Sequence, residues 1–191
     1  MIIRKILFAL CVTGTLVFFS MDMKKKEDVI QNGRLVYFDM RQRDPRSLMQ
    51  GDYMHLNYGM ENNMRRDNVT LSPEGYVVIW LDSNRVARFI RVQDQPEPLH
   101  DTELVVKYRT RKNFFGADPV LGPASFFFEE EKAECFSTAR YIEMRVDENG
   151  TAILTGLADW DFCRLHEQDS ASYHHWLENH PPPPPPPPGI D

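Results

Sequence analysis

Cysteines and clustered basic residues are both scarce in this chain of 191 residues. The three cysteines, Cys11, Cys135 and Cys163, are too few for a disulfide scaffold, and no two of them have the C-x-x-C spacing. The formal net charge is −6, and no stripe of Lys and Arg is interleaved with aromatic residues. Because phosphate binding needs clustered cations, we expect no nucleic-acid partner. The 42% of apolar residues is enough for one compact domain.

A recognisable catalytic group is also missing. The stretch around residues 51–52 resembles a strand of signal peptidases and related Ser-Lys proteases, which need a nucleophilic serine and a lysine base. Ser47 lies closer to this stretch than those enzymes require, and the strand expected to supply the base carries Arg88 and Arg91. Arginine stays protonated and cannot act as a general base. The sequence therefore predicts a protein that is not an enzyme and has no cofactor and no metal site.

The longest apolar segment lies at the N-terminus. An uncharged run from Ile6 to Met21 is bracketed by basic residues at positions 4–5 and 24–26. A helix over this run is about 24 Å long, and flanking basic side chains that reach outward extend it toward the thickness of a bilayer. We expect a retained membrane anchor. A cleaved signal peptide is one alternative, although Phe18 and Ser20 make a poor cleavage site, and a buried helix is another.

Strand patterns dominate the rest of the chain. The predicted strands cover residues 34–42, 52–58, 76–82, 86–92, 103–111, 126–128, 141–146 and 152–157. A turn at 82–84 and another at Asn149-Gly150 each connect the two strands of a predicted hairpin. Residues 129–140 are rich in Glu, Lys and Ala and predict one short helix. The expected fold is mainly β (α+β), with a transmembrane helix followed by one curled antiparallel sheet or small barrel.

These patterns divide the chain into four segments. We expect a membrane anchor at 1–23, a juxtamembrane linker at 24–33, a β-rich domain at 34–166 and a tail at 167–191. The tail contains eight consecutive prolines, which favour an extended polyproline II rod about 25 Å long. We predict a disordered tail. A ligand for an aromatic-lined groove and a spacer remain as alternatives.

The stretch QGDYMHLNY has a simple structural interpretation. Gly51 suits a turn with positive φ, and Asp52 can accept hydrogen bonds from nearby backbone N–H groups. Beyond the turn, alternation directs Met54, Leu56 and Tyr58 to one face of a strand, where they are expected to pack in the core. The buried Tyr58 hydroxyl then needs a hydrogen-bond partner.

The same stretch also supports a functional interpretation. Asp52, Tyr53 and His55 would form a polar cluster at the end of a strand, where ligand contacts are common. These three residues are the candidate binding residues. A hydrolase or a small-ligand binder that uses them is the alternative to a protein without enzymatic activity.

Five positions of this stretch match a known signature. They are Gly51, Asp52, Tyr53, Leu56 and Tyr58. The chain resembles the GDYXXLXY family of bacterial membrane-anchored proteins. Two further blocks, residues 74–89 and 126–157, are similar to the family's central hairpin and C-terminal block and follow in the expected order.

This resemblance implies a short anchor, a domain on the non-cytoplasmic side and association with a multi-spanning membrane protein. No activity comes with the family. We therefore expect a single-pass protein of the bacterial inner membrane, with a periplasmic domain that binds an integral membrane protein. Cys135 and Cys163 could form a disulfide in that oxidising compartment, and two free thiols are the alternative.

Overall fold

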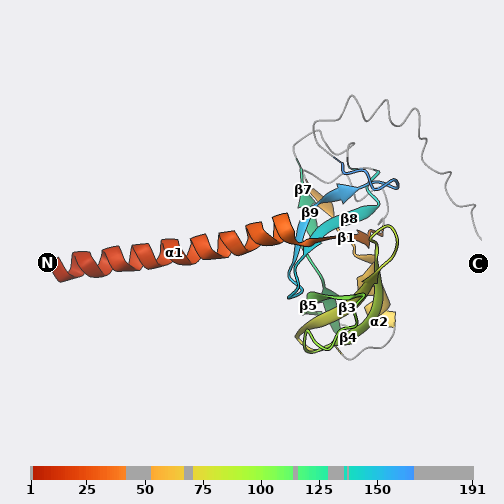
Figure 1. Ribbon diagram of the computed structural model, residues 1–191, viewed down its shortest axis with the longest axis horizontal. Helices are drawn as coiled ribbons and strands as arrows, with labels where there is room; N and C mark the ends of the chain where they lie inside the picture. Colours follow the sequence, from red (N-terminus) through yellow and green to blue (C-terminus); the bar gives the residue numbers. More distant parts are fainter. Residues whose placement is uncertain are drawn as a thin grey trace, which may run out of the picture.

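The protein consists of a long N-terminal helix and a β domain (Figure 1). The computed structural model describes residues 2–41, 53–66, 71–113, 116–128, 136 and 138–165. Its helices are α1 (Ile2–Asn32) and α2 (Gly59–Arg66). Its strands are β1 (Arg34–Asp39), β2 (Tyr53–His55), β3 (Glu74–Leu81), β4 (Ala87–Gln93), β5 (Glu103–Asn113), β6 (Gly116–Val120), β7 (Ser125–Phe127), β8 (Tyr141–Val146) and β9 (Ala152–Ala158).

The strands form three antiparallel sheets. Their orders are β1-β8-β9, β2-β7 and β4-β3-β5-β6. Two backbone hydrogen bonds connect the three-stranded sheet with the four-stranded one. The Tyr37 N–H donates to the Arg85 carbonyl over 3.0 Å, and the Lys107 N–H donates to the Gly150 carbonyl over 2.8 Å. The sheets curl as a half barrel around a single main core, to which all three sheets and α2 contribute. The predicted mainly β fold with a curled antiparallel sheet is confirmed.

Both predicted hairpins are present, with small shifts at their ends. At the β3–β4 turn, the Asp82 carboxylate accepts hydrogen bonds from the N–H groups of Asn84 and Val86, each 2.9 Å long. At the β8–β9 turn, Gly150 has a φ of 79°. Its neighbour Asn149 has no positive φ, so glycine alone provides the left-handed position that this turn requires.

The structure describes only the end of the segment predicted as a short helix, 129–140. Residues 129–135 and 137 are outside the described residues, Phe136 lies in a 3₁₀ turn, and residues 138–140 are not helical. Phe136 packs between Phe126 and Phe128, with ring centroids 5.1 and 5.4 Å away. In this part of the segment, burial of an aromatic ring in the core outweighs the helix propensity of the sequence.

Helix α2 was not predicted from the sequence. It buries Met60 and Met64, which are four residues apart and share one face of the helix. Two consecutive asparagines in its middle are poor helix formers and hide this pattern. Packing on the core, rather than propensity, therefore explains this helix.

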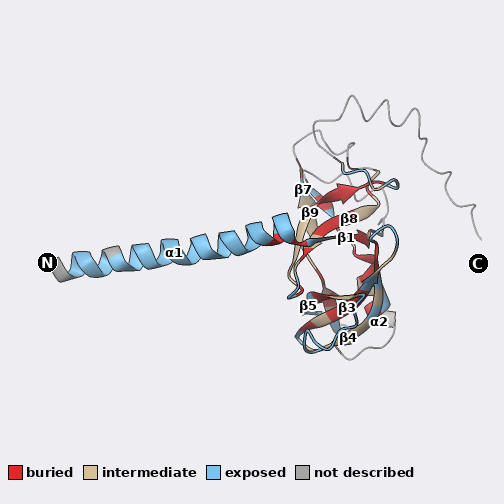
Figure 2. Cartoon of the chain, viewed as in Figure 1, coloured by how far each residue is buried: buried red, intermediate tan, exposed pale blue. Residues whose placement is uncertain are grey.

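Helix α1 continues without a break to the start of β1. The segment predicted as a linker, 24–33, is helical through Asn32. The part from Arg4 to Asn32 is long and apolar enough to cross a membrane, and none of its apolar window is buried in the protein. Figure 2 shows this exposure along α1 and the buried residues gathered between the sheets. The exposure argues against the alternative of a buried soluble helix.

Candidate functional site

The signature stretch is divided between the core and the surface. Gly51 and Asp52 lie outside the described residues. Tyr53 and His55 are exposed, whereas Met54, Leu56 and Tyr58 are buried. The predicted alternation is therefore confirmed, although the strand itself ends at His55.

The inward residues of the signature hold the loop at 121–124. The Leu56 N–H donates to the Ala124 carbonyl over 2.9 Å, and the Tyr58 hydroxyl donates to the Pro123 carbonyl over 3.1 Å. From α2, a Glu61 carboxylate oxygen accepts a hydrogen bond from the Leu121 N–H over 3.1 Å. These three hydrogen bonds attach the loop to the signature and to α2.

Tyr58 is buried and is closely approached by the loop at Gly122. Its side chain is 1% exposed, and burial, followed by the nearby Glu61 charge, raises its pKa well above the ordinary value. A Cβ on Gly122 would lie 2.5 Å from the Tyr58 hydroxyl oxygen. Glycine is therefore required for the loop to pass over the tyrosine. The Tyr58 hydroxyl remains protonated and acts as a structural hydrogen-bond donor.

The same loop forms one wall of a surface hollow of about 950 Å³. The hollow is lined by residues 74–76, 94, 107–109, 120–123 and 151–152. Its charged side chains are Glu74, Asp94, Lys107 and Arg109, two of each sign, and all four are exposed. Such a surface suits a polar ligand that carries both charges, and the signature shapes it indirectly by fixing the loop.

A second hollow, of about 780 Å³, lies at the base of α1. It is lined by residues 28–29, 32–34, 99, 101, 103–105 and 146–149. Carboxylates outnumber basic side chains in this lining. Three of them have local partners: Glu103 pairs with Arg91 over 2.7 Å, and Asp147 and Asp28 accept hydrogen bonds from the Thr151 N–H and the Asn32 side-chain amide.

The β2–β7 sheet presents an aromatic surface. Tyr53 is paired across the strands with Phe127, and His55 with Ser125. The Tyr53 ring lies 5.8 Å from that of Phe127 and 5.3 Å from that of His55, measured between centroids. Tyr53 and Phe127 are 37% and 73% exposed. Two of the three predicted binding residues therefore share one open face.

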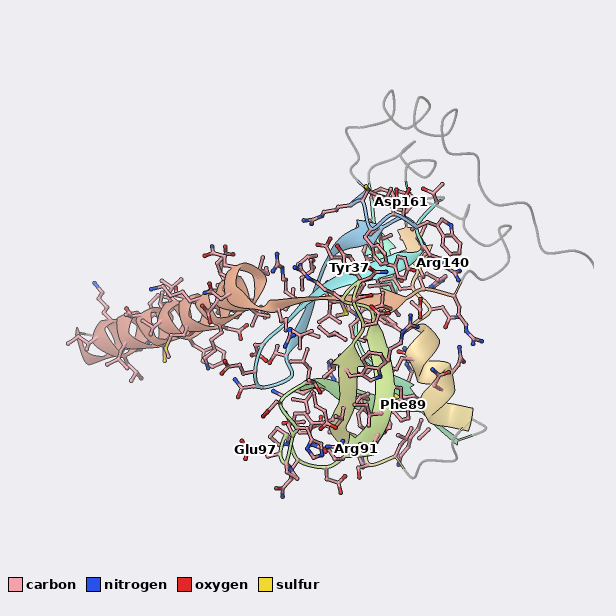
Figure 3. All side chains as sticks on the ribbon, turned by 45° about the vertical axis from the view of Figure 1, so that its right-hand side comes forward. Tyr37, Phe89, Arg91, Glu97, Arg140 and Asp161 are labelled. Atoms are coloured by element: carbon pink, nitrogen blue, oxygen red, sulfur yellow. The ribbon has the colours of Figure 1, made fainter. Side chains whose placement is uncertain are left out.

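The two buried carboxylates of the described region both have structural partners. Glu143 accepts a hydrogen bond from the Thr155 hydroxyl over 2.7 Å and lies 3.7 Å from the Arg164 guanidinium. Asp159 accepts hydrogen bonds from the N–H groups of Asp161 and Cys163. In Figure 3, Asp161 lies at the end of the domain opposite to Arg91. These contacts explain the burial of both carboxylates without a catalytic role.

The cysteines and the acidic side chains form no metal cluster in the part of the chain that the structure describes. Cys163 is exposed and forms no disulfide with a described residue, and Cys135 lies outside the described residues. The predicted Cys135–Cys163 pair stays a prediction. Although the residue is exposed, partial desolvation of its thiol, followed by the charges of Asp159 and Asp161, raises the pKa of Cys163.

Sequence reasoning missed the two hollows and the partner of Tyr53. The first hollow combines five separate segments of the chain, and no local pattern predicts such an assembly. The sequence predicts a strand over residues 126–128, and in the structure Phe127 points outward between Phe126 and Phe128. Period-two alternation within the run of three phenylalanines was the signal that could have identified its exposure.

The chain is a mainly β protein with a long N-terminal helix that is apolar enough to cross a membrane. The described residues contain no metal cluster. The family model described as GDYXXLXY protein matches residues 15–157. The chain belongs to this family. No curated protein and no solved structure matches it.

Proposed function

We propose that the protein is a membrane-anchored module without enzymatic activity, which binds an integral membrane protein next to the bilayer. In this proposal α1 is retained in the bacterial inner membrane and the β domain lies in the periplasm. One observation carries the proposal: the apolar helix enters the β domain through a packed joint rather than through a flexible linker.

The joint depends on close contacts around Gly33. Val29 in the last turn of α1 is buried, and the Arg145 guanidinium donates a hydrogen bond to the Gly33 carbonyl over 3.0 Å. A Cβ on Gly33 would collide with the carbonyl oxygen of Val29 and lie 3.2 Å from that of Val146. The helix therefore has little freedom to pivot against β8 and β9.

This geometry limits where a partner can bind. The nine helical residues from Lys24 to Asn32 span about 13 Å beyond the expected bilayer surface. The acid-lined hollow at the base of α1 then faces the region occupied by the loops of a neighbouring membrane protein. Basic loops would complement its unpaired carboxylates and set the orientation of the complex.

Photocrosslinking in intact membranes tests this proposal. A photoreactive amino acid at exposed Glu148, in the hollow, should capture an integral membrane protein, whereas one at exposed Ser83 should capture less. A Gly-Gly-Ser insertion after Asn32 should remove the crosslink while the domain stays folded, and the same insertion after Leu165 should not. Equal capture at both positions, or none at Glu148, would contradict the proposal.

Topology is tested separately with reporter fusions at residue 30 and at the C-terminus. The proposal expects periplasmic reporter activity for the C-terminal fusion. Cytoplasmic activity at both positions would refute the periplasmic placement of the domain. Appearance of a mature chain without residues 1–23 would show a cleaved signal peptide instead of an anchor.

The small-ligand alternative has one supporting observation, the hollow of about 950 Å³ with charges of both signs. This hollow is lined by Lys107 and Arg109 and not by Asp52 or His55. A ligand bound in it would therefore contact Lys107 and Arg109. Mass spectrometry of small molecules that copurify with the full chain tests it. A compound lost from the Lys107→Ala variant would favour a ligand binder over a module that binds only protein.

A further inference from the structure

The outer side of the β2–β7 sheet has an unusual composition for an exposed surface. Tyr53, His55, Ser125 and Phe127 form this face, which we term the aromatic face. The rings of Tyr53 and Phe127 are inclined by 43°, and that of His55 stands nearly perpendicular to Tyr53. The four side chains carry no carboxylate and no guanidinium or ammonium group. The exposed parts of the Tyr53 and Phe127 rings therefore offer an uncharged, angled surface to an apolar ligand.

Hydrogen bonding further narrows the class of ligand. The Tyr53 and Ser125 hydroxyls and an imidazole N–H of His55 are donors at the edges of the rings. A proline segment has the complementary chemistry, because each residue offers a carbonyl acceptor and an apolar ring but no backbone N–H. Aromatic rings bordered by donors are how proteins commonly recognise polyproline II helices.

This chain itself contains such a segment. Residues 181–188 are eight consecutive prolines, and the backbone of such a run favours polyproline II without further ordering. Fifteen residues separate Leu165 from Pro181, and they can span up to about 50 Å. The radius of gyration of a domain of this size is about 14 Å, so the run can reach any part of the domain surface.

We propose that the aromatic face is a binding site for a polyproline II helix and that its occupant is the chain's own run of prolines at 181–188. The proposal concerns a surface separate from the base of α1 and goes beyond the proposed membrane partner. It gives the exposed tyrosine of the signature a role in binding, and it gives the tail a docking site on the domain.

Binding of a labelled peptide to the full chain tests the proposal. The peptide is HPPPPPPPPGID, the sequence of residues 180–191. The first protein is the full chain in detergent, and the second is the same chain with residues 181–188 replaced by alternating Gly and Ser. The measurement is fluorescence anisotropy. The chain with the Gly/Ser replacement, termed the replaced chain, should bind the peptide. The intact chain should bind the peptide about tenfold more weakly, because its own tethered tail competes at an effective concentration in the millimolar range.

Point variants locate the site in the replaced chain. Phe127→Ala should weaken peptide binding about fivefold, since one aromatic contact is worth about 1 kcal/mol and about 1.4 kcal/mol is a factor of ten. Tyr53→Phe, which removes only a hydroxyl, should weaken it less. Trp80→Ala is the matched control, because Trp80 is 45% exposed on a different sheet, and it should leave binding unchanged.

Three results would overturn the proposal. They are no peptide binding to the replaced chain, binding that Phe127→Ala leaves unchanged, and equal losses in Phe127→Ala and Trp80→Ala. Equal binding by the intact and replaced chains would reject the chain's own tail as occupant. Crosslinked dimers that depend on residues 181–188 and increase with protein concentration would reject it too, in favour of the tail of a second copy.

Discussion

The two sides of the signature stretch differ in what they contact, although they alternate along the same few residues. On the inner side, Leu56 and Tyr58 contact the core and bind consecutive carbonyls of the loop at 121–124. On the outer side, the exposed Tyr53 contacts both His55 and Phe127. The inner side stabilises the fold, and the outer side presents aromatic rings at the surface. Neighbouring residues of one short signature can therefore have different structural environments.

A second comparison concerns the outer faces of two sheets. On the four-stranded sheet, Val78 and Val105 are opposite each other, and both are buried although they are absent from the main core. Beside them, Arg91 forms a bidentate pair with Glu103 and donates to the Pro98 carbonyl. This network covers part of that outer face, although Trp80, two residues along β3 from Val78, is 45% exposed there. The two outer faces therefore differ in charge: the four-stranded sheet carries an ion pair beside its exposed ring, whereas the aromatic face of the β2–β7 sheet carries no charged group.

The largest expected effect is on the inner side. Tyr58→Ala should lower the free energy of unfolding by about 3–5 kcal/mol, because it leaves a cavity in the core and removes a hydrogen bond. Tyr58→Phe should lower it by about 1 kcal/mol, since only the hydrogen bond to the Pro123 carbonyl is lost. Urea unfolding of the detergent-solubilised chain measures both. Similar losses for the two variants would contradict a mainly packing role for the ring.

Gly122→Ala should produce the next largest loss, about 1–3 kcal/mol, by forcing a methyl group against the Tyr58 hydroxyl. The double variant with Tyr58→Phe should be less destabilised than the sum of the two single variants, by about 0.5 kcal/mol or more. If the losses of the two single variants add up to that of the double variant, the new methyl group does not contact the Tyr58 hydroxyl. Met144, whose terminal methyl carbon would lie 3.1 Å from the new Cβ, is the next residue to examine.

The inner side of the signature could be predicted from the sequence because its determinants are local. Strand periodicity placed Leu56 and Tyr58 in the core and predicted that the Tyr58 hydroxyl needs a partner. The identity of that partner could not be predicted, since Pro123 is 65 residues away along the chain. The same limit applies to Tyr53 and Phe127, whose pairing depends on the register of two distant strands.

The helices of the domain also show packing outweighing propensity. At the described end of the segment 129–140, Phe136 and Ala139 fill the core and residues 138–140 are not helical, while a helix over residues 129–135 stays a prediction. Helix α2 has a weak helical composition, and its two buried methionines become informative only when the core beside them is known. In both places tertiary packing outweighs propensity.

The ion pair between Arg91 and Glu103 predicts a pH dependence. Hydrogen bonds from Arg91, ahead of its charge, lower the pKa of Glu103 from 4.5 to about 2. Since the folded state favours the ionised carboxylate, this stabilisation is complete above about pH 4.5 and is lost as the pH falls toward 2. Urea midpoints measured across this range should fall less steeply for Glu103→Gln and for Arg91→Gln than for the parent chain. An unchanged slope in both variants would contradict the role of this pair.

The smallest effects on stability are expected on the aromatic face. Tyr53→Ala and Phe127→Ala should each change the free energy of unfolding by about 0.5 kcal/mol, the usual range for surface substitutions. Their double variant should show a coupling of about 0.2–1 kcal/mol, since the two rings form a cross-strand pair. Yet both variants should weaken binding of the proline peptide, which Tyr58→Phe should leave unchanged. A loss of several kcal/mol in Tyr53→Ala would show that the outer side is structural as well, and the division of the signature into two sides would fail.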